Sequence, residues 1–82
     1  MASRRRPYPI KLAEKLTKLR LDLGLSQSDI AKRVGVKDRS TISGYEREER
    51  EPPLTVLLEY ARLAPGVTME ILCDDKLKLP KI

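Results

Sequence analysis

The 82-residue sequence predicts an all-α fold, a compact bundle of about five short helices that contains a helix-turn-helix. Three observations predict it. Apolar residues recur at helical spacing in short runs, capping residues precede these runs, and glycine or proline follows them. A chain of this length supports one small core, and a 40% share of hydrophobic residues argues against disorder.

The first predicted helix spans residues 12–23, where four leucines fall at helical spacing and Gly24 ends the run. These leucines are expected to face the core: Leu12, Leu16, Leu19 and Leu23. Lysines at 11, 15 and 18 are expected on its other faces. Residues 1–9 combine Arg4–Arg6 with two prolines and predict a basic flexible arm, which either reaches DNA or remains a solvated end. Residues 10–73 are expected to form the helix-turn-helix domain and residues 74–82 a tail.

Two capped helices with a glycine between them form the predicted motif. Ser26 is a good N-cap for the first, whose apolar face is Ile30, Ala31 and Val34. Gly35 suits the left-handed conformation that ends a helix. Asp38 can cap a second helix over about 38–48, with Ile42 and Tyr45 facing inward. Two capped helices, a glycine turn and a small residue at the crossing are typical of a helix-turn-helix.

The remaining elements are shorter. Pro52-Pro53 predict the start of a fourth helix, Pro65-Gly66 its end, and Thr68 the cap of a short fifth helix that contains Ile71 and Leu72. The fourth helix is expected to bury one stripe of Leu54, Leu57, Leu58 and Ala61. The tail alternates charge and leucine, and it either pairs as an edge strand with a second copy or, as we favour, lays two leucines on the core.

The formal net charge of +5 is concentrated in the front half of the chain. Residues 1–20 hold seven lysines and arginines against Glu14 alone, and further basic residues surround the glycine turn, whereas residues 46–51 are net acidic. A basic front half suits a polyanion docked on one face. Surface lysines that only aid solubility are the alternative explanation.

Several short matches also carry a family resemblance. They are Leu19-Arg20, Gly24-Leu25-Ser26-Gln27, Ile30-Ala31, Val34-Gly35-Val36, Ser40-Thr41-Ile42-Ser43, Tyr45-Glu46 and Pro52. In these residues the chain resembles the lambda-repressor-like family, the Xre/Cro-type DNA-binding domains, over roughly residues 12–72. Two departures stand out. One extra residue lies between Gly35 and Ile42, and Glu48 stands where the family usually has a glycine after its second motif helix.

The resemblance implies a sequence-specific double-stranded DNA-binding protein, a repressor-like transcriptional regulator that places its recognition helix in the major groove. It also implies a structural ion pair between Arg20 and Glu46; two exposed charges are the alternative. Facing outward on the recognition helix, the expected base-reading residues are Arg39, Ser40, Ser43 and Gly44, with Arg39 the best candidate for a guanine. A phosphate contact or a local salt bridge remains open for Arg39. The expected phosphate contacts are Ser26, Gln27, Lys37, Thr41, Arg47 and Arg50.

Other functional classes find little support. The chain has no histidine and one cysteine, Cys73, and it has no glycine-rich phosphate loop or metal-ligand spacing, so we expect neither an enzyme nor a cofactor or metal. No apolar run approaches the ~20 residues of a membrane span, and a lone cysteine suits the reducing cytoplasm. An antitoxin-like or other protein-interaction module is the main alternative function, and a nonspecific nucleic-acid binder is a third.

One helix-turn-helix reads only a few base pairs, so a homodimer on a palindromic site is the expected mode of binding. We expect no separate dimerisation or effector domain after residue 82. The dimer would then be small, DNA-assisted or formed through the fourth and fifth helices and the tail.

Overall fold

The computed structural model describes residues 10–81, and in this range the chain forms five α-helices and no strand. The helices are α1 (Leu12–Asp22), α2 (Gln27–Val34), α3 (Arg39–Glu46), α4 (Leu54–Ala61) and α5 (Met69–Cys73). The predicted all-α bundle is confirmed. The predicted basic arm, residues 1–9, lies outside the described residues. Among the described helices, none has the length and apolar character needed to cross a bilayer.

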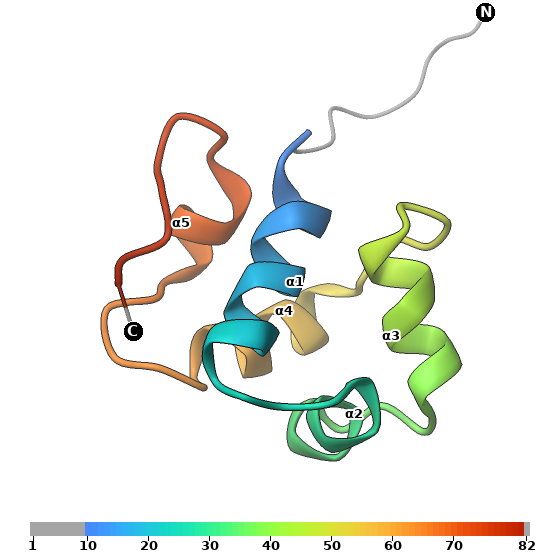
Figure 1. Cartoon of the computed structure of the whole chain (residues 1–82). Helices are drawn as coiled ribbons and strands as arrows, with labels where there is room; N and C mark the ends of the chain where they lie inside the picture. The colour runs from blue at the N-terminus through green and yellow to red at the C-terminus, as the bar shows by residue number, and fades with distance from the viewer. Residues whose placement is uncertain (1–9, 82) are drawn as a thin grey trace, which may run out of the picture.

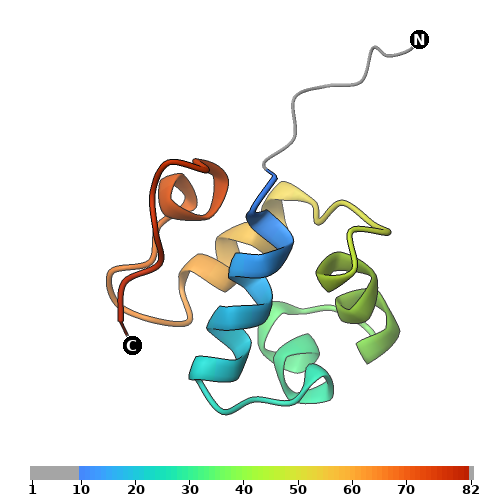
Figure 2. The same ribbon diagram turned by 45° about the horizontal axis from the view of Figure 1, so that its top comes forward.

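The core forms around α1, which runs between α5 with the tail on one side and α3 on the other (Figure 1). Leu12, Leu16 and Leu19 are completely buried along one face of α1, as their spacing predicts. In both views α4 crosses behind α1 (Figure 1 and Figure 2). Since the chain has neither Phe nor Trp, the aromatic part of the described core comes from Tyr45 and Tyr60. The remaining core side chains are aliphatic.

Lys15 corrects one prediction for α1. Its spacing places it off the leucine stripe, yet its side chain is buried. The Lys15 Nζ donates to the carbonyl of Ile71 at 2.6 Å and to that of Asp74 at 2.8 Å. These carbonyls lie at the C-terminal end of α5, where free C=O groups and the helix dipole favour a cation. A tertiary contact that helical periodicity cannot indicate therefore buries this lysine.

The stripe predicted for α4 is partly wrong. Leu54 and Leu58 face solvent, with exposed fractions of 72% and 40%, whereas Val56 and Tyr60 are buried. Only Leu57 and Ala61 of the predicted stripe are buried. The sequence Leu-Thr-Val-Leu-Leu-Glu-Tyr-Ala is apolar around most of the helix, so spacing alone does not choose its buried face. Placing the large Tyr60 ring entirely inside turns the two leucines outward.

The tail closes the bundle against the start of α1. Of the two tail leucines expected to lie on the core, Leu79 packs against it and Leu77 does not, and residues 74–81 form no strand. The Asp75 carboxylate accepts the N–H groups of Lys11 and Ile10, both at 2.9 Å. These two backbone donors hold the pKa of Asp75 below its usual range. The tail therefore satisfies amides ahead of α1, whose N-cap residue supplies no side-chain hydrogen bond.

Candidate nucleic-acid interface

The helix pair α2–α3 is built by the local signals that the sequence predicts. The Ser26 Oγ accepts the N–H of Asp29 at 3.0 Å, and the Asp29 carboxylate accepts the N–H of Ser26, which completes a capping box. Hydrogen bonding of the Asp29 carboxylate to the Ser26 side chain, and then to the Ser26 N–H, lowers the pKa of Asp29. Gly35 ends α2 at φ 77°, a left-handed conformation, and the N–H of Val36 returns to the carbonyl of Ala31 at 2.8 Å.

The first turn of α3 is organised by Asp38. Its Oδ1 accepts the Thr41 N–H at 3.2 Å, the Ser40 hydroxyl at 2.7 Å and the Thr41 hydroxyl at 3.3 Å. These bonds, above all the one from Ser40, lower the pKa of Asp38. Because the Ser40 proton is engaged in this bond, the hydroxyl offers its lone pairs outward. It can accept from the amino group of cytosine or adenine.

An ion pair fastens the end of α3 to α1. Arg20 Nε donates to Glu46 Oε2 at 2.8 Å, and Nη2 donates to Oε1 at 3.2 Å. The two side chains are only 13% and 7% exposed. Arg20 Nη1 donates to the carbonyl of Leu25 at 2.9 Å, and Gln27 Nε2 donates to Glu46 Oε1 at 3.1 Å. The implied Arg20–Glu46 pair is present, and it also links α3 to the start of α2.

Two kinds of hydrogen-bond donor remain available for a ligand at the start of α2. The amides of Gln27 and Ser28 have no partner among the described residues, because they precede the first intrahelical bond, from Ile30 to Ser26. One of the two Gln27 Nε2 protons is donated to Glu46, and the other remains available. A helix N-terminus with free amides favours an anion.

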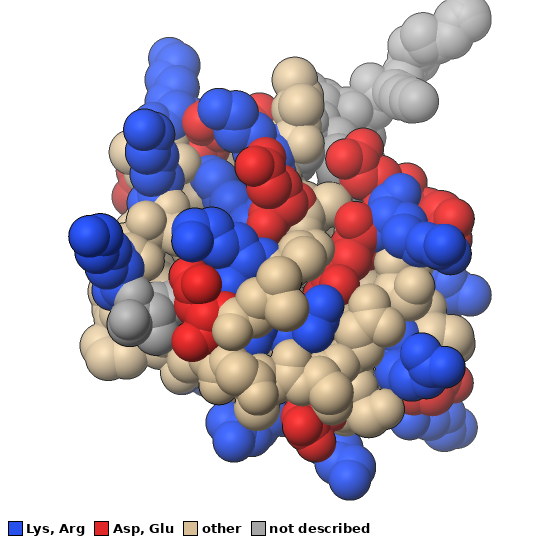
Figure 3. All heavy atoms as spheres, in the orientation of Figure 1, with Lys and Arg blue, Asp and Glu red and all other residues tan. Residues whose placement is uncertain are grey.

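Of the basic residues expected to contact DNA, Lys37 lies in the turn, Arg39 at the start of α3, and Arg47 and Arg50 after the end of α3. Lys37, Arg39 and Arg50 are exposed and form no ion pair with other described residues. The local salt bridge considered for Arg39 is therefore absent within residues 10–81. Arg47 is exposed and lies 4.0 Å from Glu49. On the face drawn in Figure 3, basic and acidic side chains are interspersed, so charge alone does not outline an interface.

Gly44, which was expected to face outward, is not exposed. It follows Ser40 by four residues and precedes Arg47 by three, so the three share the outer face of α3. Gly44 is nevertheless buried, because the Arg50 side chain lies over it. A Cβ built at Gly44 would stand 2.8 Å from Arg50 Cδ, well inside van der Waals contact. The surface at this position is therefore formed by Arg50, which sequence reasoning did not place there.

The loop after α3 folds back on the helix rather than extending it. The helix ends at Glu46, two residues before the predicted boundary, and Glu48 takes φ 64°. A left-handed conformation favours glycine, which the family usually has at this position. Glu48 adopts the same left-handed conformation although it is not a glycine. The N–H groups of Glu49 and Arg50 both donate to the Gly44 carbonyl, at 2.8 and 3.1 Å.

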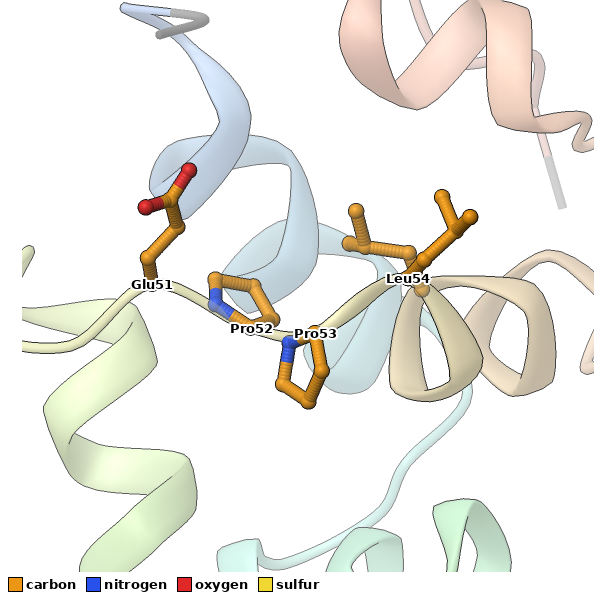
Figure 4. Close-up of a pocket in the computed structure, with 5 residues that line it drawn as sticks. Glu51, Pro52, Pro53 and Leu54 are labelled. Atoms are coloured by element: carbon orange, nitrogen blue, oxygen red, sulfur yellow. The ribbon is translucent and has the colours of Figure 1, made fainter. Parts of the chain in front are cut away.

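The chain then enters α4 through two prolines. Pro52 is buried, and the Pro53 carbonyl accepts the N–H groups of Val56 and Leu57 at 3.0 and 3.1 Å. A shallow hollow lies here, lined by Glu51, Pro52, Pro53, Leu54 and Leu57 (Figure 4). It carries no constellation for catalysis. Within residues 10–81, no cluster of His, Cys, Asp or Glu could hold a metal ion.

A helix-turn-helix family model matches residues 11–72 of the chain, which is most of its length. The chain belongs to the lambda-repressor-like, Xre/Cro-type family. Two solved structures have a similar fold. One is titled SinR protein/SinI protein complex; its TM-score is 0.69 at 26% identity, over 79% of this chain and 62% of that chain. The other, a hypothetical transcription factor NHTF from Neisseria, has a TM-score of 0.64 at 26% identity, over 88% and 87%.

This lambda-repressor-like chain also has curated relatives. It is 44% identical over 52 residues to proteins named Antitoxin HigA1 from two strains of Mycobacterium tuberculosis. The matched segment is 63% of this chain and 34% of each relative, so the chain spans about a third of the length of these relatives.

Proposed function

We propose that the chain is a sequence-specific, double-stranded DNA-binding regulator that acts in the cytoplasm. The carrying observation is the Arg20–Glu46–Gln27 cluster, which braces the end of α3 against α1 and α2 while leaving the outer face of α3 polar. A helix held rigidly in this way can present side chains to the major groove in a fixed register. The family match and the likeness to a transcription factor support the same function.

The proposed base contacts come from α3. Arg39 sits in its first turn, is exposed and has no ion-pair partner in the described chain, so its guanidinium is available to guanine O6 and N7. Ser40 accepts from an exposed amino group, and Ser43 supplies a weaker contact because it is half-buried.

The proposed phosphate contacts flank that helix. Gln27 supplies its second amide proton, and the Ser26 hydroxyl supplies its own proton while accepting from Asp29. The free amides at the start of α2 reinforce both contacts. Lys37 and Arg47 complete the set from the turn and from the C-cap of α3. The Thr41 hydroxyl, which the sequence also suggests, already donates its proton to Asp38.

The proposed binding unit is a homodimer on an inverted repeat, with the two half-sites about one turn of DNA apart. Leu54 and Leu58 lie one turn apart on α4 and are both exposed, which gives a second copy an apolar contact on this helix. A contact of this size requires DNA to hold the two copies together.

The experiment is selection of binding sites from randomised duplex DNA at roughly physiological salt, since phosphate contacts dominate at low salt. We expect one enriched inverted repeat, and we expect Arg39→Ala to relax the preference at one base pair of each half-site. Lys32→Ala, which removes an exposed charge from α2 instead, is the matched control and should leave the preferred sequence unchanged. If no sequence is enriched while binding still falls steeply with salt, the proposal of specific readout is wrong.

An antitoxin-like role is the second candidate, because the curated relatives are named antitoxins. In that case the chain would bind a protein partner as well as DNA. Purification at physiological salt from the native cell distinguishes the two, since a tight partner would accompany the chain stoichiometrically.

A further inference from the structure

The outer face of α3 has a gap in its own side chains at Gly44. Ser40 and Arg47 project from the same face in the turns on either side, and both are exposed. Gly44 contributes no side chain, yet it is buried by a residue from outside the helix. The three atoms nearest to a Cβ built there are Cδ, Cγ and Nε of Arg50, at 2.8, 3.0 and 3.3 Å.

These distances describe an arginine laid across the helix. The aliphatic part of Arg50 crosses the surface at Gly44, and the guanidinium follows directly from Nε. The fold-back of the loop fixes this path, since the Arg50 N–H donates to the Gly44 carbonyl. The Arg50 charge also lies close enough to Tyr45 to oppose the rise in the Tyr45 pKa that burial causes.

The Arg50 guanidinium is also free to bind a ligand. Arg50 makes no hydrogen bond from its side chain and no ion pair with any described residue, although three glutamates neighbour it in sequence. A planar guanidinium without an internal partner, supported along its stem, is well prepared for a bidentate contact.

We propose that Arg50 is a specificity-determining residue that reads a base edge in the major groove. Its side chain occupies the place where a side chain at position 44 would lie, and Gly44 is its positioning residue. The inference rests on the proposed function and extends it. The sequence alone predicted Arg50 as a phosphate contact and Gly44 as a base-reading position. The structure assigns the reading group to Arg50, because a Cβ at Gly44 would displace the Arg50 stem.

The test measures the thermal stability of the full chain and its variants. It also measures their salt-dependent binding to the duplex selected by the wild type and to duplexes changed at one base pair. Arg50→Ala is expected to lose about 5- to 150-fold discrimination at one base pair, the range of a bidentate contact. Because Arg50 is exposed, this variant is expected to fold. Arg50→Lys keeps the charge but not the fork, and it should not restore the preference. Arg47→Ala, which removes a proposed phosphate contact from the same face, is the matched control: it should weaken binding equally on all duplexes and leave the preferred base unchanged.

Gly44→Ala is expected to relax the same base pair as Arg50→Ala, and the double variant should lose no more than Arg50→Ala alone. A merely structural role for Gly44 would change the melting temperature without changing which base is preferred. If Arg50→Ala instead weakens binding equally on all duplexes and lowers the salt slope by about one phosphate contact, Arg50 binds a phosphate and the proposal is overturned. A wild type that selects no site refutes the proposed function itself, before any variant is compared.

Discussion

Removing the Glu46 carboxylate is expected to destabilise the fold strongly. Glu46 is 7% exposed and accepts three hydrogen bonds, two from Arg20 and one from Gln27. Glu46→Ala leaves the Arg20 guanidinium, itself 13% exposed, with the Leu25 carbonyl as its remaining partner. Stranding one charge of a buried pair typically costs about 3–5 kcal/mol. Since a domain of this size shifts its melting temperature by about 4–8 °C per kcal/mol, the fall should be at least about 12 °C.

The free energy of unfolding is measured by urea titration followed by far-ultraviolet circular dichroism. The control is Lys18→Ala, which breaks an ion pair on the same helix with Asp22 at 3.2 Å. Those side chains are 61% and 35% exposed, so solvent screens the pair and its loss should cost at most about 1 kcal/mol. The contrast between the two variants isolates the contribution of burial.

Two results would refute this reasoning. One is a Glu46→Ala variant that unfolds within about 1 kcal/mol of Lys18→Ala, because burial would then add nothing to the pair. The other comes from the double variant Arg20→Met/Glu46→Leu, which replaces both charges with apolar groups. We expect it to be more stable than either single truncation, since no charge is stranded. A double variant that loses the sum of the two single effects would contradict the assignment of the cost to a stranded charge.

Three further predictions follow from other contacts. The pKa of Asp38 is lowered in the folded chain, so the stabilisation from its carboxylate is present above the unfolded pKa and is lost as pH falls through the lower, folded pKa. Urea midpoints should therefore fall as the pH is lowered from about pH 6 to about pH 2. They should fall less for Asp38→Asn, because its side chain keeps a capping oxygen but does not titrate. Lys15→Met removes the donor to the carbonyls of Ile71 and Asp74 and should cost about 1–3 kcal/mol in the same urea assay, whereas Lys76→Met, an exposed lysine, should cost little. Leu54→Lys/Leu58→Lys should weaken binding to the full inverted repeat but not to a half-site in gel-shift titrations; an equal loss on both would exclude the α4 contact.

The elements defined by local chemistry could be predicted from sequence. Ser26, Asp38 and Thr68 each cap the helix that follows them, and Gly35 adopts the left-handed conformation its position requires. Caps and stops depend on residues three or four positions apart, which a sequence displays directly. The Arg20–Glu46 pair was implied by family resemblance alone, because nothing local places residues 20 and 46 together.

The remaining features depend on contacts between distant segments. Lys15 is buried because α5 ends beside it, and Arg50 covers Gly44 because the loop turns back at Glu48. For Gly44 one signal was available. A glycine inside an exposed helix face costs about 0.5–1 kcal/mol relative to alanine, so its presence suggests close approach by another group. No sequence pattern names that group.

The seam between α1 and the tail bears on how the chain folds in time. The hydrogen bonds that the Ile10 and Lys11 N–H groups donate to Asp75, and those that Lys15 donates to the carbonyls of Ile71 and Asp74, join residues 56 to 65 positions apart. Loops of this length close after local structure has formed, whereas α2 and α3 are neighbours in the chain. We expect these bonds to be absent from the folding transition state. Variants at Asp75 and Lys15 should then accelerate unfolding and leave the folding rate almost unchanged. These hydrogen bonds would therefore set how slowly the domain unfolds.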